Sequence, residues 1–395
     1  MRLLHILPSI ALETGGTATS VLQLCRLQAR SGKEVVLYTT NWPNEDLPDS
    51  SGACFDQSAK AFTINTFPAK TGSLFFRAPH SPALIGALTA NLATFDAVVC
   101  HSLWNPLATF SMRLLRKKGA RYSLMPHGML DPVVLRHNRW KKLPWGALWE
   151  RSNVEGASSV LFNTEAEQRK ARLCGWRLRQ TFVLPHVVEA SLWRNLPPRS
   201  AFEDLFPQVK GAEVILFVGR LNWVKNLDKL IDALAVVLRK RPSAMLVCVG
   251  PDSDGHRYEL ERRAAAMGLN GNILFTGMLV DDQLKAAYAR ANIAALVSQK
   301  ENFGLTAAEA LASGLPVVVS TGVDLSATWA SQGPVRRVAP TSPEIASAII
   351  ELLERADEHG LPDPEAQALA EKECGESRVL GLLDTCWSMV SAQQL

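Results

Sequence analysis

Short apolar segments rich in β-branched residues alternate with amphipathic segments along nearly the whole chain. The strands predicted in the first half are Leu3–Leu7, Glu34–Thr39, Ala97–His101, Tyr122–Met125, Ser159–Phe162 and Thr181–Leu184. Those predicted in the second half are Val214–Gly219, Met245–Gly250, Ile273–Thr276, Ile293–Val297 and Pro316–Val319. Between them lie segments of helical spacing, in which apolar residues recur every three or four positions. Fully apolar strands separated by helices predict an α/β fold with parallel sheets covered on both faces.

The pattern breaks once, at residues 196–210, which are rich in proline and charge and are typical of an interdomain linker. We therefore expect two Rossmann-like, doubly wound domains that face a cleft. The first spans residues 1–196 and the second residues 197–375, and a last helix at about 376–395 is expected to pack back on the first domain. The length of 395 residues suits two domains of ordinary size.

Composition favours a globular protein of a reducing compartment. Hydrophobic residues make up 47% of the chain and charged residues 20%, as in ordinary globular proteins. The seven cysteines are scattered and form no Cys-x-x-Cys pair, so neither a disulfide framework nor a zinc site is expected. The first apolar segment is interrupted by His5 and Pro8, which indicates a buried strand rather than a secretion signal. These features predict a cytoplasmic location.

Charge is distributed unevenly between the two halves. Residues 1–200 hold 24 Lys and Arg against 13 Asp and Glu, a net charge of +11, and the remainder holds 18 against 25, a net charge of −7. Such clustering is compatible with charge that only keeps the surface soluble. It also suits an anionic acceptor or membrane surface as a partner of the first half. Nucleic acid is not expected, because aromatic residues do not alternate with the basic ones as in a stacking platform.

Loops at the carboxyl ends of parallel strands are the places where such sheets bind ligands. After the first strand, Gly15, Gly16 and Thr17 open a helix. Glycine lets backbone N–H groups approach an oxyanion, and the N-terminus of a helix adds a favourable potential. A Gly-Gly pair is also common in plain turns, so this loop alone is a weak indication.

The first loop of the second half, Gly219–Asn226, contains two cations just before a predicted helix. Arg220 and Lys225 could neutralise a diphosphate there without a divalent cation, since one offers a planar fork of donors and the other an ammonium group. The alternative is a solvated basic loop.

The segment Ser298–Ala312 contains two carboxylates eight positions apart. Glu301 lies in the loop before a predicted helix, and Glu309 lies within that helix among Ala and Leu. A carboxylate is costly to bury without a partner, and the vicinal hydroxyls of a sugar or ribose would be suitable partners.

Two histidines, His101 and His127, each follow a strand of the first half. Either one alone is more commonly structural than catalytic. Two of them at strand ends of one sheet favour a role at a ligand site.

Together these motifs resemble those of the family-four retaining glycosyltransferases, which have the two-domain GT-B fold. The resemblance covers essentially the full length and rests on the E-x7-E element Glu301–Glu309, the G-R-x4-K-N element Gly219–Asn226, His127-Gly128 and Gly15-Gly16. One departure is Pro185-His186-Val187, which stands where many members have Asn-Gly and which affects the expected hinge more than the chemistry.

The resemblance implies roles for these residues. Arg220 and Lys225 would hold the diphosphate of a nucleotide sugar, Glu301 would contact the transferred sugar and Glu309 the ribose. His127 would lie close to the reacting centre. Further donor contacts are implied for Gly16, Gly219, Gly250, Gly277, Met278, Asn302, Phe303, Gly304 and Leu305, and acceptor contacts for Gly15, Thr17 and His101.

The function predicted in this way is retaining, metal-independent transfer of a sugar from a UDP-, GDP- or ADP-sugar to a hydroxyl of a glycan or lipid-linked acceptor. No separate cofactor and no metal are expected. The segments His127–Pro132 and Arg139–Lys142 resemble members that build bacterial exopolysaccharide or cell-surface glycans. Two alternatives remain open, a nucleotide-sugar 2-epimerase with the same fold and a non-catalytic glycan-binding protein.

One segment, Leu135–Trp149, predicts contact with a membrane. It combines cations and interfacial aromatics within a short stretch, namely Arg136, Arg139, Trp140, Lys141, Lys142, Trp145 and Trp149. Such a segment could lie in the headgroup layer at the inner face of the plasma membrane. The alternative is that the tryptophans belong to the core and the charges are simply solvated.

Overall fold

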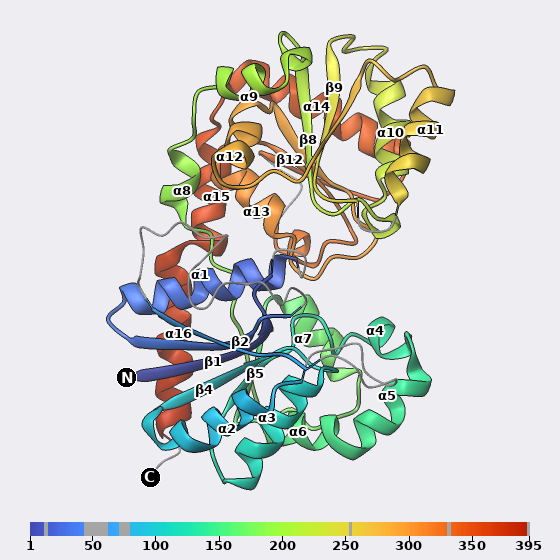
Figure 1. Cartoon of the computed structure of the whole chain (residues 1–395). Helices are drawn as coiled ribbons and strands as arrows, with labels where there is room; N and C mark the ends of the chain where they lie inside the picture. The colour runs from blue at the N-terminus through green and yellow to red at the C-terminus, as the bar shows by residue number, and fades with distance from the viewer. Residues whose placement is uncertain (12–14, 43–61, 71–79, 253–254, 330–332, 393–395) are drawn as a thin grey trace. The chain divides into compact units, whose positions relative to one another are not determined.

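The computed structural model describes residues 1–11, 15–42, 62–70, 80–252, 255–329 and 333–392. It divides into two compact units, unit 1 with Met1–Val187 and Val379–Leu395, and unit 2 with Val188–Arg378. Each unit has one sheet of parallel strands with helices on its faces (Figure 1). The predicted α/β class with two Rossmann-like sheets is therefore confirmed.

The sheet of unit 1 has seven described strands, and its order reverses beside the first of them. The strands are β1 Arg2–Ser9, β2 Glu34–Thr40, β3 Thr63–Phe67, β4 Ala97–His101, β5 Ser123–Met125, β6 Ser159–Phe162 and β7 Gln180–Val183. They lie in the order β3-β2-β1-β4-β5-β6-β7. The chain moves outward from β1 to β3 on one side and from β4 to β7 on the other, so β1 and β4 flank the topological switch point. The strand β3 was not predicted, because this edge strand has no fully buried residue and no long apolar run.

Alternation along β1 sends its side chains to two different cores of unit 1. Leu4 and Ile6 pack with α2 and α3 on one face of the sheet. Leu3 and Leu7 pack with α1 on the other face. The helices involved are α1 Gly16–Arg30, α2 Pro82–Asn91, α3 Pro106–Lys117, α6 Arg151–Gly156, α7 Glu165–Arg172 and α16 Glu376–Ala392. From Val379 onward α16 belongs to unit 1, where Leu383 and Trp387 pack with Leu24 of α1.

A chain of short elements follows β5 in unit 1. These are α4 Pro132–Arg136, α5 Arg139–Trp145 and the π-helical turn η3 Gly146–Glu150, which leads into α6. Asp131 caps α4 by accepting a hydrogen bond from the Val133 N–H at 2.7 Å. Pro144 lies inside α5, and the break in regular α-helix geometry at η3 follows directly after it.

The sheet of unit 2 repeats the arrangement of unit 1. Its described strands are β8 Glu213–Val218, β9 Ala244–Val249, β10 Ile273–Gly277, β11 Ile293–Leu296, β12 Val317–Ser320 and β13 Val335–Val338. The order β10-β9-β8-β11-β12-β13 places the switch point between β8 and β11. The edge strand β13 was not predicted, because its sequence VRRV contains two charged residues.

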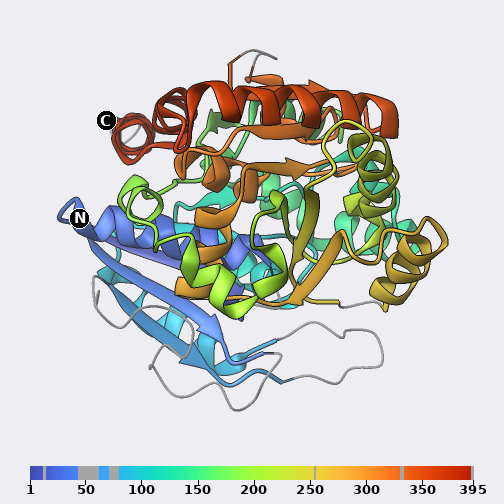
Figure 2. The same ribbon diagram turned by 90° about the horizontal axis from the view of Figure 1, so that it is seen from above.

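Helices cover both faces of the sheet of unit 2 (Figures 1 and 2). α10 Leu227–Val237 packs against α14 Ser342–His359 and α11 His256–Ala266. α12 Asp281–Arg290 packs against β8, and α13 Leu305–Ala312 packs against β11, β12 and α15 Pro364–Cys374. The core between these layers is almost entirely Leu, Ile, Val and Ala.

The segment 196–210 does not form the linker expected from its composition. It contains α9 Ser200–Leu205 and the 3₁₀ turn η4 Pro207–Val209. Phe202 and Val209 are fully buried in the core of unit 2, as is most of Trp193 in the preceding helix α8 Ala190–Arg194. The prolines and charges suggested a linker, but the aromatic and aliphatic residues between them anchor the segment to unit 2. The two units divide between Val187 and Val188, before the expected boundary at residue 196.

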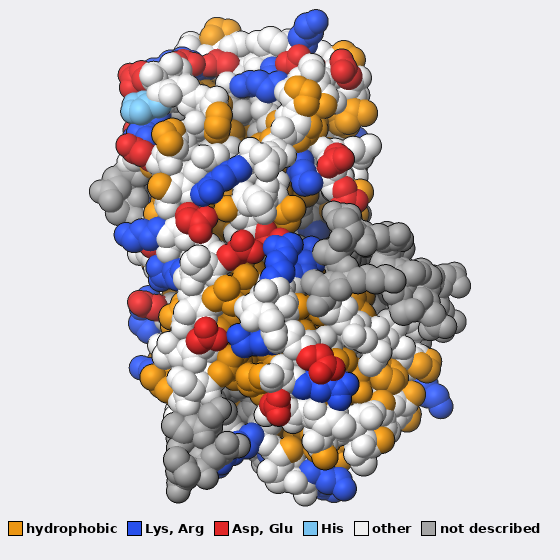
Figure 3. Space-filling view, turned by 90° about the vertical axis from the view of Figure 1, so that its left-hand side faces the viewer, with side chains coloured by type: hydrophobic (Ala, Val, Ile, Leu, Met, Phe, Trp, Pro, Cys, Tyr) orange, Lys and Arg blue, Asp and Glu red, His pale blue; other side chains and the backbone are white. Residues whose placement is uncertain are grey.

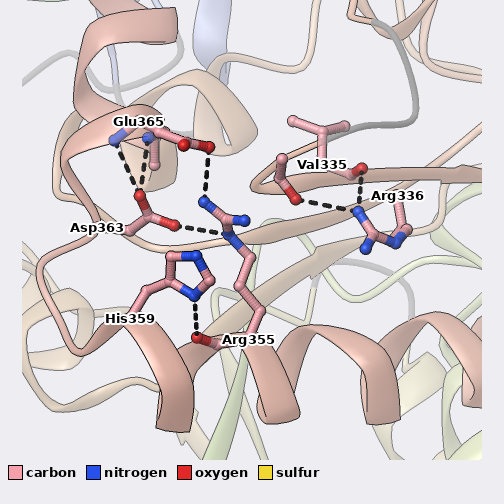
Figure 4. A network of polar contacts seen from close by, with 8 residues as sticks. Val335, Arg336, Arg355, His359, Asp363 and Glu365 are labelled. Atoms are coloured by element: carbon pink, nitrogen blue, oxygen red, sulfur yellow. Dashed lines mark hydrogen bonds and ion pairs between the residues drawn. The ribbon is translucent and has the colours of Figure 1, made fainter.

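The junction of α14 and α15 in unit 2 is held by one arginine (Figure 4). Arg355 donates from Nε to Asp363 at 2.8 Å and from a terminal nitrogen to Glu365 at 2.7 Å. Asp363 also caps α15 by accepting from the Glu365 N–H at 2.9 Å. Asp363 is 1% exposed, so the hydrogen bonds from Arg355 and from the Glu365 N–H replace the water that this buried carboxylate has lost.

Acidic and basic side chains intermingle on the face of each unit drawn in Figure 3. The basic surplus of residues 1–200 is therefore not gathered on that face. Among the described residues, no helix is both long enough and apolar enough to cross a bilayer.

Candidate functional site

At the switch point of unit 2, the loops after β8 and β11 are hydrogen-bonded to each other. The Gln299 N–H donates to the Val224 carbonyl at 2.7 Å, and the side chain of Asn226 donates to the Val297 carbonyl at 2.9 Å. Asn226 adopts a left-handed conformation with φ 52° as it starts α10. An asparagine tolerates this conformation better than most residues. These contacts set the two predicted donor motifs side by side.

Lys225 and Glu301 form an ion pair between these two loops. Their side chains are 17% and 26% exposed, so the pair is only partly screened by water. The Glu301 N–H donates to the Gly322 carbonyl at 2.9 Å, which fixes the backbone beneath the carboxylate. Arg220 lies on the same β8 loop and is exposed. The two loops thus carry one anion, one paired cation and one exposed cation.

Gly219 and Gly250 cross at a distance that excludes any side chain. A Cβ on Gly250 would lie 2.0 Å from the Gly219 carbonyl oxygen. The Gly219 N–H donates to Val249 and the Gly250 N–H to Gly277, at 2.9 and 2.8 Å. The loops after β8, β9 and β10 therefore meet through backbone alone, and Met278 beyond them is 45% exposed. Residues 253–254 of the β9 loop lie outside the described residues.

The turn into α13 is shaped by Gly304, whose φ of 90° is unfavourable for other residues. A Cβ there would lie 2.7 Å from Val323, so the position also lacks space. Phe303 is 3% exposed and anchors the turn in the core, whereas Asn302 and Leu305 stay partly exposed.

Glu309 is buried on α13 and faces a tyrosine. Its carboxylate is 3.2 Å from the hydroxyl of Tyr288 on α12. Burial raises the pKa of Glu309 to about 8, and the hydrogen bond from Tyr288 offsets only part of this shift. Burial thus favours the protonated form of Glu309, whereas the sequence led us to expect an ionised carboxylate.

A cavity of about 400 Å³ lies at the switch point of unit 1. It is lined by the end of β1, the start of α1 including Thr17, and the loop after β4. Trp42, Trp104 and Lys142 form other parts of its wall. Gly15 and Gly16 directly precede Thr17, and Gly16 is exposed. Thr14, which precedes these glycines, lies outside the described residues.

The wall of this cavity at Trp104 is held by a buried carboxylate. Glu150 accepts from the Trp104 N–H at 2.9 Å and from the Thr109 hydroxyl at 2.5 Å. Burial raises the pKa of Glu150. The Trp104 ring nitrogen donates to the Met129 carbonyl at 3.0 Å. The indole ring is therefore fixed in place before any ligand binds.

His101 and His127 are brought together at 3.0 Å between ring nitrogens. His127 is partly exposed and borders a small void beside His186 and Ser20. His101 is fully buried, so it offers no atom to an acceptor, and the contact expected for it is not available. Its burial follows from its position on β4, where it shares the face of the sheet that Val99 contributes to the core beneath α1 and α16.

Several residues at these sites were given no role at a ligand site from the sequence. These are Tyr288 beside Glu309, Trp42 and Trp104 on the cavity wall, and His5, His186 and Gln28 near His127. His5 did give a signal, because a histidine inside an otherwise apolar strand has to find a hydrogen-bond partner.

The predicted membrane segment separates into two parts in the structure. Trp145 and Trp149 pack on each other and on Phe110, with centroid distances of 4.5 to 6.1 Å. Trp140, in contrast, is 69% exposed. The large exposed apolar residues here are Trp140, Leu143 and Leu148 of this segment and Val133 just before it. Together with the exposed cations Arg136, Arg139 and Lys141, we call them the α5 patch.

Among the described residues, no three His, Cys, Asp or Glu side chains cluster in a way that could hold a metal ion. The prediction of metal independence depends on the reaction and is not decided by this finding.

Two family profiles match the chain. Residues 15–186 match the glycosyl transferase 4-like domain, and residues 202–364 match the glycosyl transferases group 1. A D-inositol 3-phosphate glycosyltransferase of Kineococcus radiotolerans is 32% identical over 179 residues, which are 43% of this chain and 41% of that protein. A mannosylfructose-phosphate synthase of Agrobacterium fabrum is 35% identical over 135 residues, 32% of this chain and 30% of that protein. The chain thus matches less than half the length of these curated relatives.

Solved structures resemble the chain over almost its whole length. A sucrose-phosphate synthase of Thermosynechococcus elongatus has a TM-score of 0.78 at 20% identity and covers 99% of both chains. The Anabaena protein HepE, solved in complex with UDP and glucose, has a TM-score of 0.74 at 20% identity and covers 98% of this chain and all of that one. Identities this low establish the fold alone. With both halves matched by glycosyltransferase profiles and the fold shared with these structures, the chain belongs to the family-four glycosyltransferases of GT-B fold.

Proposed function

We propose that the chain is a retaining glycosyltransferase that moves a sugar from a nucleotide sugar to a hydroxyl of a glycan or lipid-linked acceptor. The observation that supports this most is the switch point of unit 2, where Lys225 and Glu301 pair across two hydrogen-bonded loops and Arg220 lies exposed on one of them. Cations there suit a diphosphate, and a carboxylate beside them suits sugar hydroxyls.

In this proposal the donor binds along the loops of unit 2. Arg220 and Lys225 hold the diphosphate, Glu301 contacts the transferred sugar and Glu309 accepts from the ribose. The loops after Gly250 and Gly277 hold the base. HepE was solved with UDP and glucose, so a UDP-sugar is the first donor to test.

The acceptor is proposed to bind in the cavity of unit 1. Indole rings such as those of Trp42 and Trp104 offer flat apolar faces to a sugar, while Thr17 and Lys142 offer polar groups. Two curated relatives have a phosphate in the names of their substrate or product. Phosphorylated sugars and lipid-linked phosphates are therefore the acceptors to test first.

The chemistry proposed is attack on the same face of the sugar that the leaving group departs from. Negative charge develops on the departing nucleoside diphosphate, and Arg220 and Lys225 stabilise it because they are already in place. The departing phosphate oxygen takes the proton of the acceptor hydroxyl as the new glycosidic bond forms, so the configuration is retained. No divalent cation is required in this scheme.

Incubation of UDP-sugars with and without acceptors tests the proposal. A transferase makes glycoside and UDP only when acceptor is present, and NMR of the product should show a retained anomeric configuration. A 2-epimerase would instead release UDP and altered sugar without acceptor, and a glycan-binding protein would release neither. The sequence Asp252-Ser253-Asp254 has the Asp-x-Asp spacing of some metal sites, so the assay is repeated with excess chelator. Loss of activity that Mn²⁺ or Mg²⁺ restores would contradict metal independence.

We further propose that the α5 patch contacts an anionic membrane at the cytoplasmic face. Four exposed apolar side chains next to three exposed cations suit insertion among anionic headgroups. Each cation near such a surface contributes about 1 kcal/mol, which gives reversible binding without an anchor. Co-sedimentation with phosphatidylserine vesicles should then decrease with added salt.

Two variants sharpen this vesicle experiment. Replacing Arg139, Trp140 and Lys141 by Ser should abolish sedimentation. Replacing Arg172 and Arg177, exposed basic residues elsewhere in unit 1, should leave most of it. Wild-type protein that stays in the supernatant at low salt would show that the patch does not bind membrane.

A further inference from the structure

Four histidines of unit 1 form a continuous stacked row. His5 lies on β1, His101 ends β4, His127 follows β5 and His186 follows β7. Successive ring centroids are 5.2, 5.3 and 5.8 Å apart, and the planes differ by 18°, 24° and 15°. These histidines form one connected group, because each ring is part of the environment of the next.

Hydrogen bonds connect the first three rings from end to end. His5 Nε2 is 2.8 Å from Gln28 Oε1, and His5 Nδ1 is 2.9 Å from His101 Nε2. His101 Nδ1 is in turn 3.0 Å from His127 Nε2. Both nitrogens of His5 and of His101 are thus used within the row.

The rings of this row are neutral. Burial lowers the pKa of His5 and of His127 to about 4, and it lowers the pKa of His101 and of His186 well below the usual range. A neutral imidazole has one nitrogen that donates and one that accepts. Each hydrogen bond in the row therefore dictates the tautomer of the ring beyond it.

The hydrogen bonds of an imidazole row can all point in one direction along the row or all in the other. The side-chain carbonyl of Gln28 selects one of these two arrangements. Because Gln28 Oε1 accepts, His5 donates from Nε2 and accepts at Nδ1. His101 then donates from Nε2 to His5, and His127 donates from Nε2 to His101. The row leaves His127 with its Nδ1 lone pair directed away from His101.

The surroundings of His127 hold it in a fixed place. Its backbone is left-handed, with φ 49°. The next N–H, that of Gly128, donates to Glu167 at 2.5 Å, and the Asn163 N–H donates to the same carboxylate at 2.7 Å. Asn163 Nδ2 lies 3.4 Å from His127 Nδ1, while Asn163 Oδ1 is buried with no partner among the described residues. At the partly exposed His127, where the hydrogen-bonded part of the row ends, Nδ1 thus has only a long contact with the Asn163 amide and lies near an unsatisfied carbonyl oxygen.

We propose that Gln28, His5 and His101 are positioning residues that hold His127 in the tautomer protonated on Nε2, so that its Nδ1 accepts a hydrogen bond from a hydroxyl of the substrate. The tautomer itself is a property of the ligand-free chain. Its use in transfer rests on the proposed function, in which His127 lies close to the reacting centre.

Nitrogen-15 NMR of histidine-labelled protein tests the tautomer directly, because a protonated and a bare ring nitrogen differ widely in chemical shift. The eight histidines are assigned by single substitutions. We expect the His5, His101 and His127 signals to show protons on Nε2. A wild-type spectrum with His127 protonated on Nδ1 would overturn the proposal without any variant.

A matched pair of variants at His101 separates positioning from packing. In His101→Asn the side-chain amide reaches the place of Nδ1, so its oxygen can still accept from His127. In His101→Gln the amide reaches the place of Nε2 instead, and His127 loses its partner. We expect His101→Asn to keep the His127 tautomer and His101→Gln to lose it, with turnover about tenfold lower in the Gln variant. Identical His127 spectra in the two variants would overturn the proposal.

A second pair at Gln28 tests the other end of the row, should the His101 variants fold poorly. Gln28→Glu keeps an acceptor for His5, whereas Gln28→Met removes it. Only Gln28→Met should disturb the tautomer of His127, across two intervening rings. UDP affinity, proposed to reside in unit 2, should be unchanged in all four variants, and hydrogen exchange in β4 serves as the check that unit 1 is folded. A shifted tautomer with unchanged turnover would refute the role of His127 in transfer while leaving the tautomer assignment standing.

Discussion

Unit 1 and unit 2 place their candidate ligand groups at the same topological position, where the strand order reverses beside the first strand. The groups themselves differ in kind. Unit 2 brings an ion pair and an exposed arginine to loops crossed by glycines. Unit 1 brings indole rings to a preformed cavity, and neutral imidazoles border a separate small void. The shared topology determines where a ligand can bind, and the loop sequences determine which ligand it is. A diphosphate suits the cationic loops of unit 2, and a sugar suits the cavity of unit 1 with its indole rings.

The two sites also differ in what holds them in shape. In unit 2 the loops are joined by backbone hydrogen bonds, the Asn226 side chain and close glycine contacts, so changes at Arg220 or Glu301 should leave the loops intact. In unit 1 the shape depends on side chains, with Glu150 holding the Trp104 loop and the histidine row holding His127. Substitutions in unit 2 should therefore affect ligand binding and chemistry with little loss of stability.

The largest effect on turnover is expected at Glu301, and it tests whether the loops of unit 2 bind the donor. Glu301→Gln should lower turnover by about a hundredfold, in the range seen when one group that stabilises a transition state is removed. Free UDP should bind almost as well as before, because Glu301 is proposed to contact the sugar only. Glu309→Gln should show the opposite profile, with UDP and UDP-sugar both bound more weakly. Equal damage profiles for the two glutamates would contradict this division of roles.

The next largest effect concerns the cations of unit 2. Arg220→Ala and Lys225→Ala should each weaken UDP binding by about tenfold or more, since a charge-assisted hydrogen bond is worth about 1.5–3 kcal/mol. Uridine without phosphates should bind all variants alike, as measured by calorimetry. Unchanged UDP affinity in both variants would show that the diphosphate binds elsewhere.

A smaller effect is expected on the cavity of unit 1. Trp42→Ala should raise the KM for the acceptor several-fold, because the ring forms part of the cavity wall. The KM for the donor should stay the same. With a water-soluble acceptor, Trp140→Ala is the matched control, since this exposed indole is not part of the cavity lining. A rise in the donor KM alone would move the acceptor out of this cavity.

The sequence predicted most of the parallel strands of both units, because their apolar runs can be recognised from local sequence. It missed β3 and β13, edge strands whose exposed or charged residues lack that pattern. The donor motifs were found because glycine, cation and carboxylate spacing is local to each loop. The partners of these residues were not, since Tyr288 meets Glu309 and Gln28 meets His5 only through tertiary packing. The sequence also does not show which side chains are exposed, so it could not distinguish the exposed Trp140 from the packed Trp145 and Trp149.

The smallest expected effects concern stability, and they run in opposite directions with pH in the two units. Glu309 has a folded pKa of about 8, above its usual value, so the folded state holds a proton that the unfolded state releases between about pH 4.5 and 8. Stability from this group is full at the low end of that window and is lost as the pH rises through 8. In unit 1 the pKa of His5 falls to about 4, so the unfolded state binds the extra proton and stability is lost as the pH falls from about 6.5 toward 4.

Two substitutions should flatten these opposite slopes one at a time. Each unit of pKa shift corresponds to about 1.4 kcal/mol between the two protonation states, so the changes should be visible as melting-temperature differences of several degrees. From pH 6 to pH 8 the melting temperature of wild type should fall relative to that of Glu309→Gln. From pH 6.5 down to pH 4.5 the melting temperature of wild type should fall relative to that of His5→Gln. Hydrogen exchange in β8 reports the stability of unit 2, and hydrogen exchange in β4 reports that of unit 1. If the stability of both units changed with pH in the same direction, burial of Glu309 and His5 would not be the cause.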